Sequence, residues 1–93
     1  MEFLVRIQVN LPPDIPEERR QELLAAEAQR GRELIEAGHI RRIWRIPGRL
    51  ANISLYQADD ATELHQLVSS LPLWPWMDVQ LDSLALHPLE AGD

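Results

Sequence analysis

One glutamate stands where a helix would be expected to bury its apolar stripe. By spacings of three and four residues, Glu27 shares a helical face with Leu23, Leu24, Gly31, Leu34, Ile35 and Gly38. A carboxylate in the middle of such a stripe loses water, which raises its pKa and makes it a better base. In the alternative interpretation, Glu27 lies at the border of the stripe and reaches solvent or pairs with Arg30. The spacing alone leaves both interpretations open.

Arginines form the second group of candidate site residues. All nine basic residues of the chain are arginine, and four of them fall within nine positions that contain no carboxylate: Arg41, Arg42, Arg45 and Arg49. Guanidinium groups favour planar, bidentate contacts with carboxylates, so the cluster is a candidate anion site. Because isoleucines and Trp44 alternate with these arginines, the segment fits the solvated face of an amphipathic strand equally well.

A proline-stiffened segment carries two of the three tryptophans of the chain. It reads Leu71-Pro72-Leu73-Trp74-Pro75-Trp76-Met77. Tryptophan is enriched both in ligand pockets and in subunit interfaces, so the segment is a candidate for either. Both interpretations hold together if a pocket lies between subunits.

Composition argues against several other functions. The net charge of −6 disfavours nonspecific binding to nucleic acid, which depends on neutralising phosphates with basic side chains. The absence of cysteine excludes disulfides, thiolate metal sites and thiol nucleophiles. His39, His65 and His87 lack the spacing of a metal cluster, no serine sits in a nucleophile elbow, and the four glycines are isolated. We therefore expect neither a metal nor a cofactor.

The length of 93 residues predicts a single domain, residues 1–93, with an ordinary globular composition. No apolar run approaches the length needed to cross a membrane. The first strand is expected to begin at about Phe3, which leaves no room for an export signal. A cytoplasmic protein that binds neither nucleic acid nor membrane is the expectation.

The first third of the chain predicts a strand and a long helix. Residues 3–10 alternate between apolar and polar side chains, as in a half-buried strand. A helix from about Ile15 to Ala37 follows, with Asp14 and Glu17 spaced as a capping pair at its start. Gly38 is placed to end that helix in the left-handed conformation.

The remainder predicts a hairpin, a second helix and a last strand. The expected elements are strands His39–Ile46 and Leu50–Tyr56 around the turn Pro47-Gly48, a helix with the stripe Leu64, Leu67, Val68 and Leu71, a strand through Met77, Val79 and Leu81, and a tail from Leu86 to Asp93. Asp60 and Glu63 repeat the capping spacing before the second helix.

This order of elements predicts the α+β, ferredoxin-like βαββαβ fold, with an antiparallel sheet and two helices on one face. The other face of the sheet would also carry apolar residues. A second subunit is the economical cover for such a face, so we expect an oligomer, at least a dimer.

Four segments of the chain resemble the muconolactone Δ-isomerase family: Val5-Arg6-Ile7-Gln8-Val9-Asn10-Leu11-Pro12, Trp44-Arg45-Ile46-Pro47-Gly48, Ala51-Asn52-Ile53-Ser54 and Leu71-Pro72-Leu73-Trp74-Pro75-Trp76-Met77-Asp78. His87-Pro88 also fits, and the resemblance runs nearly the whole length in register. It implies a ferredoxin-like subunit of a ring-shaped homo-oligomer, a decamer, with active sites at subunit contacts. It also implies conversion of the lactone substrate, muconolactone, to 3-oxoadipate enol-lactone without a cofactor, in the catechol branch of aromatic catabolism.

The resemblance also implies roles for individual residues. Glu27 falls at the acidic position of the family, where a carboxylate of raised pKa would remove a proton from the lactone and return it to another carbon. Arg45, with Arg49 as a second candidate, would hold the carboxylate of the substrate, and Asn52 would donate to the dienolate oxygen. Three tryptophans complete the expected substrate-binding set: Trp44, Trp74 and Trp76. The alternatives are an exposed strand residue for Arg45 and a backbone-bonded polar residue for Asn52.

The chain departs from the family pattern near the expected site. Ala28 stands where the family has a lysine, Arg49-Leu50 where it tends to have His-Tyr, and Ile40 where it has a tryptophan. Without a cation beside it, the pKa of Glu27 would be less depressed. The departures keep two alternatives open: a paralogue acting on a substituted lactone, similar to chloromuconolactone dehalogenase, and a small-acid-binding assembly without catalysis.

Overall fold

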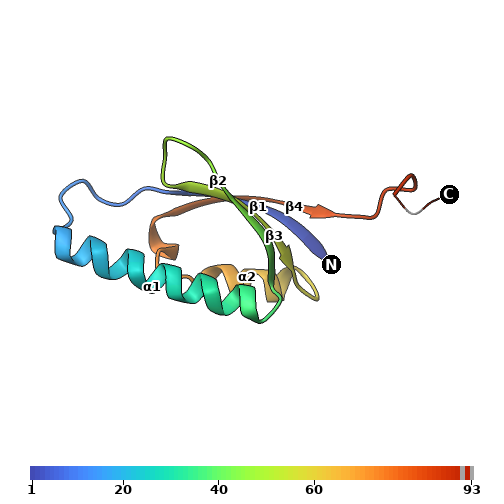
Figure 1. Cartoon of the computed structure of the whole chain (residues 1–93), viewed down its shortest axis with the longest axis horizontal. Helices are drawn as coiled ribbons and strands as arrows, with labels where there is room; N and C mark the ends of the chain where they lie inside the picture. Colours follow the sequence, from blue (N-terminus) through green and yellow to red (C-terminus); the bar gives the residue numbers. More distant parts are fainter. Residues whose placement is uncertain (91, 93) are drawn as a thin grey trace.

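A computed structural model describes residues 1–90 and 92 of the chain. The elements are β1 (Glu2–Val9), α1 (Glu17–Glu36), β2 (Ile40–Arg45), β3 (Ala51–Gln57), α2 (Ala61–Ser69), the short 3₁₀ turn η1 (Trp74–Trp76) and β4 (Met77–Leu84). All neighbouring strands are antiparallel, in the order β2-β3-β1-β4. Both helices lie on the same face of the sheet (Figure 1). The predicted α+β plan is confirmed.

The side of the sheet that faces the helices is set by β1. Its apolar residues Phe3, Val5, Ile7 and Val9 are all buried. Residues paired across antiparallel strands project to the same face, so the register extends this helix-facing surface onto the neighbouring strands. On β3 it continues with the partners of Phe3, Val5 and Ile7, which are Tyr56, Ser54 and Asn52.

Strand β2 contains one residue too many for regular pairing with β3. Ile40 pairs with Tyr56, yet the next pair joins Arg42 to Leu55, so Arg41 is the extra residue of a β-bulge. A bulge changes the phase of side-chain alternation in the strand that carries it. Regular alternation from Ile40 would turn Arg42 toward the helices. Because of the bulge, Arg42 instead faces the outer side of the sheet, and each later residue of β2 is reversed in the same way.

The ends of the helices bear out the predicted caps only in part. Asp60 accepts a hydrogen bond from the Glu63 N–H at 2.8 Å and caps α2 as predicted. Gly38, with φ of +82°, follows α1 in the left-handed conformation. The predicted pairing of Asp14 with Glu17 is wrong, because Glu17 is already the first helical residue and no described side chain caps α1. A proline directly before the helix removes one N–H that would otherwise need a partner.

No element in residues 1–90 and 92 covers the outer face of the sheet (Figure 1). Leu4, Ile53 and Leu55 lie on it and are only half-buried. After β4 the chain leaves the body of the domain as an extended tail (Figure 1), along which Leu86 and Leu89 are exposed. No helix among the described residues is long and apolar enough to cross a membrane.

Candidate active site

A cavity of about 460 Å³ lies between α1 and the helix-facing surface of the sheet. Most of its wall is apolar, with residues from α1, from β1, β2 and β3, and from the segment that leads into β4. Its polar side chains are few: Glu27, Arg32, Arg45, Asn52, Ser54 and Tyr56. An apolar cavity with a small number of converging polar groups is typical of a site for a small organic ligand.

The cavity exists because the middle of α1 carries small residues toward the sheet. Leu23 and Leu34 are buried and hold the helix against the core at two points. Between them, Ala28 and Gly31 line the cavity. A Cβ atom added at Gly31 would meet nothing within 4 Å. The helix therefore leaves space between the two buried leucines.

Glu27 is partly buried in this space, in agreement with the first of the two interpretations of the interrupted stripe. Its Oε1 accepts a hydrogen bond from the Leu73 N–H at 2.9 Å. Burial raises the pKa of the Glu27 carboxyl above its usual value of 4.5, and the hydrogen bond from Leu73 opposes part of that rise. The contact fixes one carboxylate oxygen and leaves Oε2 without a hydrogen bond in the described part of the chain. The arrangement suits a base that exchanges protons through one oxygen.

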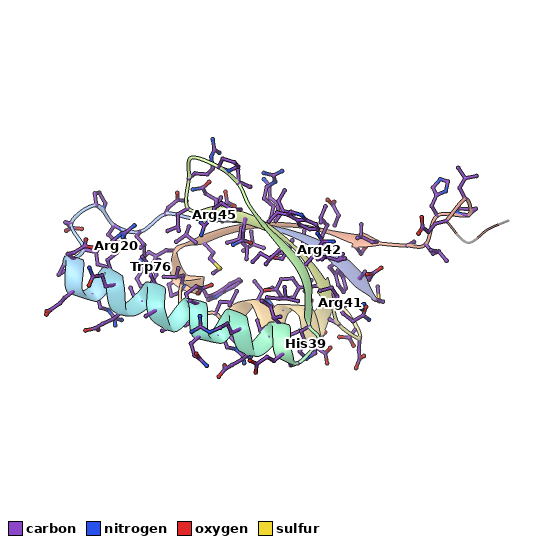
Figure 2. All side chains as sticks on the ribbon, in the orientation of Figure 1. Arg20, His39, Arg41, Arg42, Arg45 and Trp76 are labelled. Carbon is purple, nitrogen blue, oxygen red and sulfur yellow. The ribbon has the colours of Figure 1, made fainter. Side chains whose placement is uncertain are left out.

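Arg45 and Asn52 face the cavity together. They are paired across β2 and β3, and both line the cavity wall; Figure 2 labels Arg45 at the end of β2. The Ser54 hydroxyl donates to Oδ1 of Asn52 at 3.2 Å. With its oxygen engaged in this way, the Asn52 amide has its NH₂ group available to donate to a ligand.

Trp44 and Arg49, which the sequence also placed in the site, do not line this cavity. Trp44 pairs with Ile53 on the outer face of the sheet, where the Arg42 guanidinium lies 5.0 Å from the centre of its ring. The bulge in β2 turns Trp44 outward and Arg45 inward. Arg49 lines a smaller, separate pocket with residues of β1 and β4.

The tryptophans of the proline-stiffened segment also lie outside the wall of the cavity. Trp74 is exposed and contacts His65 edge to face, with ring centres 5.6 Å apart. Trp76, labelled in Figure 2, packs against the hydrophobic core instead. Residues between and beside the prolines supply the wall: Leu71, Leu73 and Met77. The segment therefore contributes apolar wall and the backbone N–H that holds Glu27.

Three polar residues of the cavity were missed from the sequence: Arg32, Ser54 and Tyr56. The sequence does carry a signal for Ser54 and Tyr56, because both alternate with Asn52 along one face of a predicted strand. Polar residues on the buried face of a strand indicate either a buried network or a ligand site. Arg32 had no such signal, since it lies among other charged residues of a long helix.

Among the described residues, no three His, Asp or Glu side chains are grouped so that they could hold a metal ion. The cavity carries one carboxylate and two guanidinium groups, from Glu27, Arg32 and Arg45. Cations of this kind suit an organic anion as ligand.

The sequence comparisons identify the family. Residues 1–90 match the family described as muconolactone delta-isomerase. The chain belongs to this family. It is 41% identical over 93 residues to muconolactone Delta-isomerase 2 of Acinetobacter lwoffii, covering 100% of the chain and 97% of that protein. Its identity to the muconolactone Delta-isomerase of Pseudomonas aeruginosa is 38% over 88 residues, or 95% and 92% of the two chains.

The fold of the family is shared as well. A crystal structure of muconolactone isomerase superimposes with a TM-score of 0.88 at 36% identity, covering 95% of this chain and 92% of the other. For a muconolactone isomerase-like chain, the cavity beneath α1 is the natural candidate active site, because it combines a desolvated carboxylate with a cation and an amide donor.

Proposed function

We propose that this chain is a muconolactone Δ-isomerase whose active site is the cavity beneath α1, with Glu27 as its acid-base group. Full-length similarity to muconolactone isomerases supports the reaction. The observation that carries the assignment of the site is the position of Glu27, a carboxylate of raised pKa in a mostly apolar cavity. Moving a ring double bond requires one group that accepts a proton and then returns it, and this carboxylate meets that need.

The proposed reaction has two proton transfers. Glu27 Oε2 removes a proton from one carbon of the lactone ring, and the electron pair passes through the conjugated system to the lactone carbonyl oxygen, which gives a dienolate. The protonated Glu27 then returns the proton to another ring carbon, and the double bond takes its new position. The hydrogen bond from Leu73 N–H to Oε1 holds the carboxylate in place during both steps.

Two further cavity residues serve the substrate in this proposal. Arg45 binds the acetate carboxylate of the lactone, because a guanidinium group favours bidentate contact with a carboxylate. The Asn52 NH₂, directed by the hydrogen bond from Ser54, donates to the oxygen that gains charge in the dienolate. The cavity of a single chain is not lined by Trp44, Trp74, Trp76 or Arg49. In an oligomer, these side chains would contact a substrate only if they reached the cavity of another subunit.

We propose that the protein works as a homo-oligomer in the cytoplasm, with the decamer as the expected assembly. The uncovered outer face of the sheet, with half-buried Leu4, Ile53 and Leu55, and the exposed Leu86 and Leu89 of the tail support association. Multi-angle light scattering after size-exclusion chromatography gives the mass directly. A mass of about one chain at micromolar concentration would overturn the oligomer, and another multiple would replace the decamer.

A substituted lactone remains the second candidate substrate. The observation that favours it is the set of small or apolar residues in the cavity wall at Ala28, Ile40 and Leu50, which are the positions where the chain departs from the family pattern. A cavity of about 460 Å³ has room for a ring substituent. With a chlorinated lactone, removal of the proton would expel chloride in place of returning the proton to carbon.

The experiment that tests the function follows purified protein with muconolactone by ultraviolet absorbance and by proton NMR in heavy water. We expect wild-type protein to form the enol-lactone and Glu27→Gln to lose about 1,000-fold or more in kcat, since the amide has no basic oxygen for the proton. Glu36→Gln is the matched control, because Glu36 is exposed on the same helix. It should keep full activity.

The outcomes separate the candidates. Turnover by wild type and Glu36→Gln but not by Glu27→Gln supports the isomerase and its base. Turnover that survives in Glu27→Gln would remove Glu27 from its role. An assembled wild-type protein that neither converts muconolactone nor incorporates deuterium would exclude muconolactone as substrate, and chloride release from a chlorinated lactone would then establish the second candidate.

A further inference from the structure

The hydroxyl group of Tyr56 is a cavity group to which the mechanism above gives no role. Tyr56 lies on β3 opposite Phe3 and Ile40, on the helix-facing surface of the sheet. Its side chain is 1% exposed, yet it lines the cavity. Buried phenol groups ordinarily have a hydrogen-bond partner. A tyrosine at this position therefore requires a partner or a ligand.

Tyr56 and the proposed base, Glu27, line the same cavity. Burial raises the pKa of Tyr56, and the negative charge of Glu27 raises it further, while the positive charge of Arg30 opposes the rise. The Tyr56 side chain faces the cavity from β3, and Glu27 faces it from α1. The Tyr56 hydroxyl stays protonated at neutral pH and is a hydrogen-bond donor.

The neighbours of Tyr56 are already engaged with other groups. Glu27 accepts from Leu73, and Arg30 donates to the Ser70 hydroxyl at 2.9 Å and to Glu33 at 3.2 Å. None of the hydrogen bonds found among the described residues reaches the Tyr56 hydroxyl. In the same part of the chain, no side-chain oxygen or nitrogen is fully enclosed without a partner. The hydroxyl is therefore open to the cavity.

We propose that the Tyr56 hydroxyl donates a hydrogen bond to the lactone oxygen that gains negative charge when Glu27 takes the proton, as a second donor beside Asn52. This inference rests on the proposed function and adds a residue to it. During the first proton transfer, charge leaves the Glu27 carboxylate and appears on the dienolate oxygen. A neutral donor in the same cavity as Glu27 can stabilise the charge on the dienolate oxygen. Stabilisation of developing charge by fixed donors is a large contribution to such reactions.

The chain offers a clean test, because Tyr56 is its only tyrosine. Tyr56→Phe removes one oxygen atom and keeps the buried ring against Phe3 and Ile40. We expect kcat to fall about 100-fold, as when one donor to an oxyanion is removed, with KM changed much less. The melting temperature and the assembly should stay close to those of wild type. A merely structural role would lower stability and leave kcat of the folded protein unchanged.

A second measurement also uses the fact that the chain has a single tyrosine. Biosynthetic incorporation of 3-fluorotyrosine places one fluorine atom in the chain, beside the Tyr56 hydroxyl. We expect its ¹⁹F resonance to shift when muconolactone saturates the Glu27→Gln variant, which binds the lactone without converting it. The Glu27→Gln protein without ligand gives the reference spectrum of the free cavity, because it carries the same charges around Tyr56 as the saturated sample.

The results distinguish this inference from the function on which it rests. Wild-type turnover with a slowed but stable Tyr56→Phe variant supports the inference. Wild-type turnover with an equally fast Tyr56→Phe variant, or with no fluorine shift on saturation, would overturn the role of Tyr56 and leave the isomerase in place. Absence of turnover and of binding in wild type would overturn both.

Discussion

The two helices cover the same face of the sheet with different side chains. α2 buries Leu64 and Val68, which are 1% and 3% exposed, in a continuous apolar core. The middle of α1 instead turns Glu27, Ala28 and Gly31 toward a cavity. Packing by α2 stabilises the fold, whereas α1 carries Ala28 and Gly31 where larger side chains would fill the space. The difference indicates that stability and chemistry are assigned to separate parts of one small domain.

Shortening a side chain of the packed helix should have the largest effect on stability. Leu64→Ala leaves a void in the core and should lower the free energy of unfolding by about 3 kcal/mol. The kcat of the protein that remains folded should not change, because Leu64 does not line the cavity. Urea unfolding and activity at low temperature measure the two quantities. Loss of kcat without loss of stability would show that the two regions are not separate.

Filling the cavity from α1 should have the opposite effect. Gly31→Leu places a large side chain in the cavity, and kcat/KM should fall on the order of 100-fold because the lactone is displaced from Glu27. Stability should be retained or higher, since a Cβ at Gly31 meets nothing within 4 Å and leucine has the better helix propensity. Thermal melting and steady-state kinetics test this prediction. An active, destabilised Gly31→Leu protein would contradict it.

A pair of arginines on β2 tests which face of the sheet binds substrate. Arg45→Gln should raise KM about 10- to 100-fold, as expected for loss of a charge-assisted hydrogen bond to the carboxylate. Arg42→Gln is the matched control, since Arg42 contacts Trp44 on the outer face. It should leave KM unchanged in steady-state kinetics. Equal effects of the two substitutions would place the anion site elsewhere.

The smallest effect is a dependence of stability on pH. The folded protein binds the proton of Glu27 more tightly than the unfolded chain does, because burial raises its pKa above 4.5. The stability that comes from this tighter proton binding is fully present below pH 4.5 and is lost as the pH rises through the raised pKa. Glu27→Gln should therefore be more stable than wild type at neutral pH and equal to it in acid. Urea unfolding at several pH values measures the difference, and a variant less stable at neutral pH would contradict the sign.

Much of the fold followed from local patterns in the sequence. Alternation predicted β1, the three-and-four spacing predicted α1, and Asp60 with Glu63 predicted the start of α2. These features depend on residues near one another in the chain. For Glu27, the interrupted stripe left two positions open, partial burial and the border of the stripe, and the structure shows partial burial.

The missed features depend on contacts between distant segments. The bulge at Arg41 decides that Arg45 faces the cavity and Trp44 does not, and nothing in the alternation of β2 shows one extra residue. The hydrogen bond from Leu73 to Glu27 joins residues 46 positions apart. The alternation places Tyr56 in a strand, but its position in the same cavity as Glu27 appears only when β3 lies beneath α1.

The central claim is that Glu27 is a desolvated base, and comparison of two pKa values tests it most directly. The carboxyl resonance of Glu27 in ¹³C-glutamate-labelled protein, assigned by its absence from Glu27→Gln, gives the pKa of the group itself. The acid limb of kcat/KM for muconolactone gives the pKa of the base that the reaction uses. We predict that the two values agree and that both lie above 4.5. A Glu27 resonance that titrates at or below 4.5, or a rate that follows a different pKa, would contradict the account.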